Sequence, residues 1–246
     1  MDVLNSEEIV TVKKQKESNQ LILQPVKPKT ANQKKIFEAY DENKNLFIHG
    51  IAGSGKSYLA LYLGLESVLN KEFKQMVIVR SAVPSRKQGF LPGSPEEKDE
   101  IYELPYYGLC SQLFNKQDAY KLLKGREQLK FISTSYLRGM TLDNSIIFVD
   151  EVQNMNFQEI STIMTRIGDN CNMILAGDED QNDLESSHED SCIKELHSII
   201  DKMPSFKKIE MGVEDICRND IVREWILARN PSKASNFKIL MKPIYV

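Results

Sequence analysis

The residues with the clearest chemical meaning lie at 50–57, where the sequence reads GIAGSGKS. Glycines lack a Cβ and let several backbone N–H groups converge on one anion. The lysine adds a positive charge for the outer phosphates of a nucleotide, and the serine hydroxyl is of the kind that ligates Mg²⁺ beside them. The pattern predicts a phosphate-binding loop for a nucleoside triphosphate. The expected binding residues are Gly50, Ile51, Ala52, Gly53, Ser54, Gly55, Lys56 and Ser57.

Such a loop requires a strand before it and a helix after it. The strand delivers the backbone to the phosphates, and the helix N-terminus adds the positive end of its dipole. Here the apolar run Leu46–His49 precedes the loop, and a helical stretch from Tyr58 to Asn70 follows it. The alternative is a glycine-rich turn that matches the motif by chance, and both flanks argue against it.

A second chemical element is a pair of acids at the end of the hydrophobic run Ser145–Val149. In enzymes with a phosphate-binding loop, an acid at this place meets Mg²⁺, because both groups lie at the carboxyl edge of one sheet. We assign that role to Asp150. Glu151 is expected to act as the general base that orients and deprotonates water. The alternative is a buried strand that ends in a solvated acidic turn.

A third strand, near Ile174–Ala176, also ends in polar residues. Among them, Gln181 is expected to hydrogen-bond the attacking water or the γ-phosphate. Asp178 is a weaker candidate at the same strand end. The alternative is an Asp-rich turn over residues 177–183.

The remaining apolar patterns alternate between strand and helix signals, which predicts a parallel sheet with helices on both faces. Residues 81–105 are rich in proline and glycine, and we expect a turn-rich functional segment there. The expected strands are 46–49, 76–79, 131–134, 145–149 and 173–176; the expected helices are 30–40, 58–70, 157–167, 193–202 and 221–229, with a mixed helical region up to about 130.

Size and composition set further bounds. The chain of 246 residues is long enough for one α/β domain with a sizeable core. Its net charge of −3 does not indicate a nucleic-acid partner, which would need a local basic patch. No apolar run approaches the length of a membrane span, and the N-terminus does not resemble a secretory signal. The four cysteines form no C-x-x-C pair, so we expect reduced thiols in a cytoplasmic protein without a zinc site.

Taken in series, several blocks resemble the PhoH family, ATPases related to the core of superfamily 1 helicases. The resemblance covers roughly residues 28–230, and it implies a single RecA-like lobe that binds ATP with Mg²⁺. We therefore divide the chain into a polar arm over 1–29 and an ATPase domain over 30–246. The blocks are GIAGSGKS at 50–57, QGFLPG at 88–93, YLRGMTL at 136–142, FVDEVQN at 148–154, TRIG at 165–168 and GDEDQNDL at 177–184.

The resemblance also marks Gln33. In helicase-like relatives a glutamine before the phosphate loop reads the adenine edge, for which an amide has the right donor and acceptor. The alternative is local, because Thr30 and Gln33 have the spacing of a capping box at a helix N-terminus. Both interpretations stay open at this point.

Superfamily 1 helicases have two lobes, and nothing after Asn230 is long enough for a second. The arginine that the second lobe would supply to the nucleotide must then come from elsewhere. Our candidate is Arg218, acting across a subunit interface as an arginine finger. By analogy this implies a homo-oligomer, a hexameric ring. The alternative for Arg218 is a salt bridge with Glu214 or Asp215. For Arg80 and Arg166, a structural role is favoured over a phosphate clamp.

Single-stranded RNA or DNA is an expected partner, mainly because of the resemblance. The acidic residues at 96–103 argue against a backbone contact in that segment. The candidate contacts are Arg80, Arg86, Lys87, Phe90, Arg138 and the loop 89–93.

Two other functions compete with a nucleic-acid-linked ATPase. One is a nucleotide-dependent switch or scaffold with slow hydrolysis. The other is a nucleoside kinase, because type II thymidine kinases pair a phosphate loop with a segment like Asp150–Gln153. Those kinases carry zinc-binding cysteine pairs, which are missing from this sequence.

Overall fold

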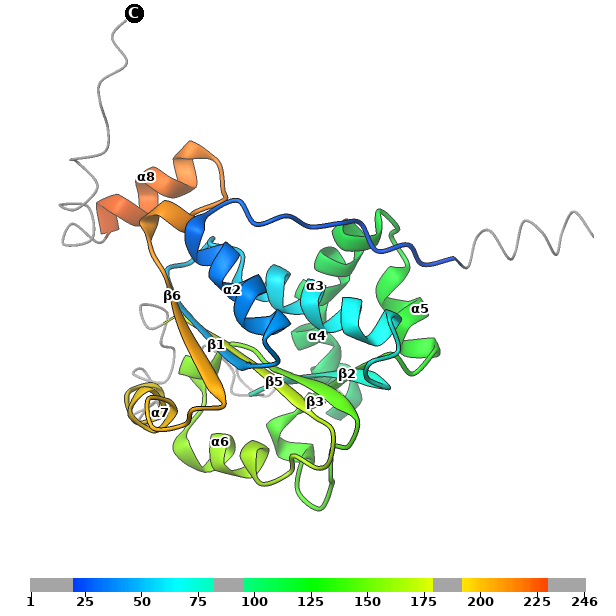
Figure 1. Cartoon of the computed structure of the whole chain (residues 1–246). Coiled ribbons are helices and arrows are strands. Elements are labelled where there is room, and N and C mark those ends of the chain that lie inside the picture. The colour runs from blue at the N-terminus through cyan, green and yellow to red at the C-terminus, as the bar shows by residue number, and fades with distance from the viewer. Residues whose placement is uncertain (1–19, 82–94, 179–191, 230–246) are drawn as a thin grey trace, which may run out of the picture.

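The computed structural model describes residues 20–81, 95–178 and 192–229, without the side chains of 95–99. They form one six-stranded sheet in the order β3-β2-β4-β5-β1-β6, and every pair of neighbouring strands is parallel. Helices cover both faces (Figure 1). The strands are β1 (Asn45–Gly50), β2 (Gln75–Arg80), β3 (Leu129–Ser133), β4 (Ser145–Val149), β5 (Asn172–Gly177) and β6 (Phe206–Met211).

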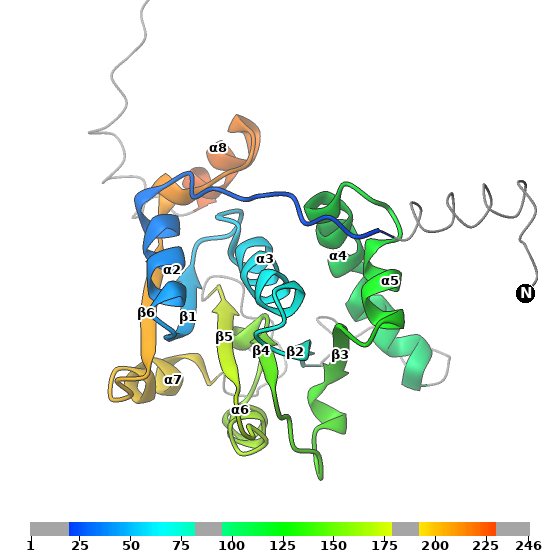
Figure 2. The ribbon, with the colours of Figure 1, turned by 45° about the vertical axis from the view of Figure 1, so that its right-hand side comes forward.

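The central strands are continuous apolar runs because both of their faces are buried. In β4, Ile146 and Phe148 point into the core on one face, whereas Ile147 and Val149 point into the core on the other. Helices α2 (Ala31–Asp41), α3 (Lys56–Leu69), α4 (Pro95–Phe114) and α5 (Ala119–Gly125) cover the first face. Helices α6 (Phe157–Met164) and α7 (Ile193–Ile200) cover the second (Figure 2). This confirms the expected α/β sheet of the RecA-like, P-loop NTPase type.

Strand β5 lies between the strand that enters the phosphate loop and the strand that ends at Asp150. It pairs with β1 through Leu46–His49 and with β4 through Ile146–Val149. The loop and the acid therefore meet across a strand that comes later in the sequence than both.

The structure differs from the expected elements in three places. Strand β6 was not predicted, because it is an edge strand with charged residues at 207, 208 and 210 and so lacks the continuous apolar run of the central strands. Helix α4 begins at Pro95, inside the segment expected to be turns, since proline suits the first position of a helix. Helix α6 ends at Met164, three residues earlier than expected.

The end of the expected N-terminal arm is described from residue 20. Residues 20–29 are extended and cross over α3 toward α4 and α5 (Figures 1 and 2). Leu21, Leu23 and Val26 pack against the core, and the Gln24 amide donates to the Leu113 carbonyl at 2.8 Å. This stretch is therefore part of the packed structure.

The segment that leads away from β6 completes the described chain. A short 3-10 turn, Val213–Asp215, is followed by α8 (Asp220–Arg229) at the edge of the molecule. Among the described residues, no helix has both the length and the apolar character that a membrane span requires.

Candidate functional site

The phosphate loop begins where β1 ends, against the last residue of β6. Gly50 has a φ of +110°, and a Cβ added there would lie 2.3 Å from the Met211 carbonyl oxygen. The next residue, Ile51, donates its amide to that same oxygen at 3.0 Å. Glycine is therefore required at position 50 for both conformation and space.

The loop is closed by its own polar side chains. The buried Ser54 hydroxyl donates to the Ile51 carbonyl at 2.8 Å. The Lys56 ammonium donates to the carbonyls of Gly50 and Ile51 at 2.7 and 2.8 Å. The lysine is thus held over the loop, at the start of α3, where its charge adds to the helix dipole.

The acid expected to meet Mg²⁺ lies beside this loop. The buried Asp150 accepts a hydrogen bond from the Ser57 hydroxyl at 3.0 Å and from the Glu151 amide at 3.1 Å, both on Oδ1. Its Oδ2 accepts one from the Tyr106 hydroxyl at 3.0 Å. Burial, and next the charge of Glu151, raise the pKa of Asp150 to about 6.

The donor set fits a magnesium ion that is shared with bound phosphates. Mg²⁺ in nucleotide enzymes is held by one or two protein oxygens together with phosphates and water. Ser57 and Asp150 supply such oxygens. Within the described ranges, no group of three or more His, Cys, Asp or Glu side chains is placed to hold a metal by itself.

The expected general base occupies an unusual conformation. Glu151 has a φ of 55°, in the left-handed region that non-glycine residues rarely adopt. Its carboxylate accepts a hydrogen bond from Gln153 Nε2, and Gln153 Oε1 accepts one from the Asp178 amide at 2.9 Å. The fully buried Gln153 therefore joins the ends of β4 and β5.

Gln153 was not among the expected site residues. Its signals in the sequence were its place in the block FVDEVQN and the likeness of Asp150–Gln153 to a segment of type II thymidine kinases. The close approach also explains Gly177, because a Cβ there would lie 2.6 Å from a Val152 methyl and 3.1 Å from Gln153 Oε1.

These groups surround a cavity of about 370 Å³, which is within the usual range for a ligand of nucleotide size. The phosphate loop, the ends of β4 and β5, helix α4 and the segment before α8 contribute to its wall. The lining residues are Ala52, Gly53, Gly55, Lys56, Ser57, Tyr58, Pro105, Leu109, Asp150, Glu151, Gly177, Asp178 and Arg218.

Arg218 lines the cavity of its own chain. Its Cγ lies 3.0 Å from the position of a Cβ on Gly53, and the neighbouring Cys217 amide donates to the Gly53 carbonyl at 3.1 Å. None of the ion pairs between described residues involves Arg218. The expected alternative, a salt bridge with Asp215 or Glu214, is therefore not formed. A position across a subunit interface is not needed to bring Arg218 to a nucleotide, and that role stays a prediction.

Asp215 instead anchors α2. It accepts hydrogen bonds from the Thr30 hydroxyl, from Asn32 Nδ2 at 2.8 Å and from the Gly212 amide at 2.8 Å. The carboxylate is fully buried. This network fixes the N-terminus of α2 against the turn that carries Arg218.

Gln33 serves the helix end and the loop together. Its amide N–H donates to the N-cap Thr30 hydroxyl at 3.2 Å, which is one of the two bonds of the expected capping box; the return bond to the Thr30 amide is not formed. Its side-chain oxygen accepts from the Lys29 amide at 2.8 Å, whereas Nε2 donates to the Ser54 carbonyl and to Cys217 Sγ, both at 3.2 Å. The buried side chain thus braces the phosphate loop, and its contact with adenine stays a prediction.

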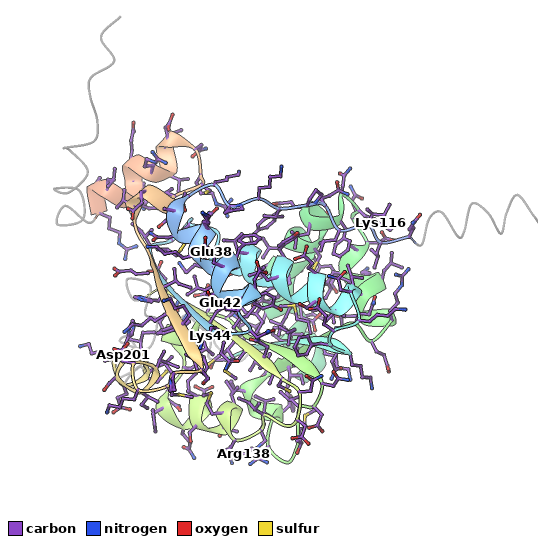
Figure 3. The ribbon with its side chains drawn as sticks, in the orientation of Figure 1. Glu38, Glu42, Lys44, Lys116, Arg138 and Asp201 are labelled. Carbon is purple, nitrogen blue, oxygen red and sulfur yellow. The ribbon has the colours of Figure 1, made fainter. Side chains whose placement is uncertain are left out.

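Of the other arginines, Arg80 lies near the site, where its charge acts on Tyr106, Asp150 and Glu151, whereas Arg166 and Arg138 do not line the cavity. Arg80 ends β2, with its guanidinium 6.0 Å from the centre of the Tyr102 ring. The main-chain oxygen of Arg166 accepts from the Leu142 amide in a turn. Figure 3 shows Arg138 at the edge of the molecule opposite α8, where it lines a separate hollow of about 450 Å³ with Thr134, Ser135 and residues of α6. Gln181, Arg86, Lys87, Phe90 and the loop 89–93 lie outside the described residues.

Sequence comparison relates the chain to one family. The family of PhoH-like proteins matches residues 25–229. A PhoH-like protein of Mycobacterium leprae is 30% identical over 200 residues, covering 81% of this chain and 57% of the relative. A PhoH-like protein of Bacillus subtilis is 30% identical over 206 residues, covering 82% and 63%. Protein PhoH of Escherichia coli is 26% identical over 208 residues, covering 83% and 57%. The chain thus spans about three fifths of the length of these relatives.

Solved structures with a similar fold are more distant. The Sulfolobus solfataricus SWI2/SNF2 ATPase core in complex with dsDNA is 12% identical with a TM-score of 0.42, covering 78% of this chain and 47% of that one. The large terminase from a thermophilic bacteriophage is 10% identical with a TM-score of 0.43, covering 82% and 50%. The family match over residues 25–229, together with the phosphate loop and its paired acids, establishes that this chain belongs to the PhoH-like protein family.

Proposed function

We propose that this chain is a Mg²⁺-dependent ATPase that hydrolyses ATP to ADP and phosphate. The observation that carries the proposal is the hydrogen bond of 3.0 Å between Ser57 and Asp150 at the cavity of the phosphate loop, with Glu151 beside it. This is the arrangement in which a phosphate loop and an acid share one metal ion.

Each residue of the site has a distinct role in binding or hydrolysis. The loop amides and Lys56 bind the β- and γ-phosphates, and Ser57 and Asp150 hold the metal. Bound Mg²⁺ would neutralise charge that develops on the phosphate oxygens. Glu151 orients a water molecule and accepts its proton as the oxygen attacks the γ-phosphorus and ADP leaves. Gln153 limits the freedom of the Glu151 carboxylate, and Arg218 of the same chain, beside Gly53, adds positive charge at the phosphates.

Two variants test this assignment. Lys56→Ala is expected to weaken ATP binding and abolish turnover, because the loop loses its positive charge. Glu151→Gln is expected to retain ATP binding and lower kcat by at least about 100-fold, the usual contribution of a general base. Lys74→Ala is the matched control, since Lys74 is an exposed lysine outside the site. Hydrolysis by Lys56→Ala at the parent rate would rule out the site.

We further propose that hydrolysis is linked to single-stranded RNA or DNA. Family membership supports this, and so do the exposed Arg138 and Ser135, whose donors suit contacts with a phosphate backbone. The measurement is ATP hydrolysis with and without each strand, on material sized by light scattering. Stimulation on a hexamer-sized particle is the expected result. Slow turnover that neither strand changes would instead favour a nucleotide-dependent switch.

A further inference from the structure

The carboxylate of Asp150 has one hydrogen-bond partner, Tyr106, that belongs to none of the sequence motifs used to identify the site. Tyr106 lies in the middle of α4, is fully buried, and donates its hydroxyl to Asp150 Oδ2 at 3.0 Å. A phenol hydroxyl can donate one hydrogen bond, and here the carboxylate receives it.

The ring of Tyr106 is held in one orientation by the sheet beneath it. It packs edge-on against Phe148 of β4, with ring centres 6.4 Å apart and planes at 85°. It also packs against Phe131 of β3, with centres 6.0 Å apart. Since the ring is held on two strands, the direction of its hydroxyl is determined by packing.

The two oxygens of Asp150 therefore have different surroundings. Oδ1 accepts from Ser57 and from the Glu151 amide, which belong to the phosphate loop and the strand end. Among the hydrogen bonds of the described residues, Oδ2 has Tyr106 as its partner. The tyrosine thus determines how the carboxylate is rotated, and so which oxygen faces Ser57 and the cavity.

Helix α4 also forms part of the cavity wall. Pro105 and Leu109 line the space expected to hold the nucleotide, and Tyr106 lies between them in sequence. The same helix consequently touches both the nucleotide cavity and the metal carboxylate.

We infer that Tyr106 is a positioning residue for the metal site: its hydroxyl holds Asp150 in the rotation in which Oδ1 and Ser57 receive Mg²⁺ together. The inference rests on the proposed function, because it presumes that Mg²⁺ binds with the nucleotide at Asp150. Partners of metal ligands commonly change metal affinity by about 10- to 100-fold when they are removed.

Tyr106→Phe separates this role from simple core filling, because it keeps the ring and removes only the hydroxyl. The assay is equilibrium binding of a fluorescent ATP analogue, first in EDTA and then as Mg²⁺ is titrated. The expected result is unchanged affinity in EDTA and a rise of at least about tenfold in the half-saturating Mg²⁺ concentration. The value of kcat should approach that of the parent at high Mg²⁺, since excess metal restores the occupied site.

The matched control is Tyr107→Phe, the same change at the next residue of α4. The Tyr107 ring packs on Tyr120 with centres 4.2 Å apart, away from the carboxylate, and the loss of its hydroxyl should leave the Mg²⁺ titration unchanged. A second test places Tyr106→Phe in an Asp150→Asn background. There the added substitution should have no further effect on binding, because the hydroxyl acts through Asp150.

The outcomes separate the inference from the proposed function. If Mg²⁺ changes nucleotide affinity in the parent and not in Asp150→Asn, but Tyr106→Phe titrates like the parent, the inference is overturned and the proposed function stands. Equal loss of affinity with EDTA and with Mg²⁺ would also overturn it, because the hydroxyl would then support the fold in general. If Mg²⁺ has no effect on the parent, the proposed function fails first. Thermal unfolding followed by circular dichroism confirms that each variant is folded.

Discussion

The buried charge of Asp150 should cost this protein stability when no metal is bound. Its pKa is raised from 3.8 to about 6, chiefly by burial. At about 1.36 kcal/mol per pKa unit, that difference corresponds to a loss of about 3 kcal/mol in the free energy of unfolding. Below about pH 3 the carboxyl is protonated in both the folded and the unfolded chain, so it contributes almost no penalty. As the pH rises toward 6 the unfolded chain ionises first, and the free energy of unfolding falls until the folded group ionises as well.

Asp150→Asn removes this penalty while it keeps the local hydrogen bonds. The amide oxygen can still accept from Ser57 and from the Glu151 amide, and the new NH₂ group can donate to the Tyr106 hydroxyl oxygen. We therefore expect the variant to be more stable than the parent by up to about 3 kcal/mol at pH 7.5 in EDTA, and by less than about 1 kcal/mol at pH 4, where the unfolded carboxyl is only partly ionised. It should also lose the effect of Mg²⁺ on nucleotide binding.

The assay is urea denaturation in EDTA, followed by circular dichroism at several pH values between 4 and 7.5. Only the difference between variant and parent is interpreted, because other groups titrate in both proteins. Asp41→Asn, at an exposed position in the last turn of α2, is the control and should give a small difference at every pH. A variant that is less stable than the parent at pH 7.5, or a difference that does not shrink as the pH falls, would refute the reasoning.

Two further predictions concern the frame around the site. Gly50→Ala should destabilise the protein by at least about 3 kcal/mol in urea denaturation, because it adds strain at positive φ to a clash with the end of β6. The control is Gly125→Ala, which has open space around it and should be near neutral. Equal effects of the two substitutions would contradict the packing argument. Lys124→Ala should cost about 1–2 kcal/mol, because the buried Glu103 loses two contacts of 2.9 and 2.8 Å, with a discount for the exposure of the lysine. Lys121→Ala, on an exposed position of the same helix, is its control, and thermal unfolding at equal salt should separate the two.

Much of the fold could be predicted because its signals are local. The central strands are short apolar runs, and their burial on both faces made them continuous and easy to find. The helix at Ala31 begins with an N-cap threonine, and the one after Gly55 follows the loop motif directly. Strand β6 was missed because its charged residues at 207, 208 and 210 interrupt the apolar pattern, as is typical of an edge strand.

In the candidate site, too, the residues with local sequence signals could be predicted and the others could not. The sequence alone determined the phosphate loop, Asp150 and Glu151, because their chemistry depends on residues that lie within a few positions of one another and on a strand end that marks the sheet edge. It also indicated the family, through blocks spread along the chain. It left two interpretations open for Gln33 and placed Arg218 by analogy alone.

Only the tertiary structure decided which distant residues meet these groups. Gln33 reaches the phosphate loop across 21 residues of sequence, and Tyr106 reaches Asp150 across 44. Arg218 comes to the cavity because the unpredicted β6 pairs with β1 and delivers the following turn beside Gly53. Such contacts depend on the order of strands in the sheet, and that order is set by how the whole set of apolar faces packs. A local pattern specifies an element and its end, whereas the partners of that end are set by the packing of the whole chain.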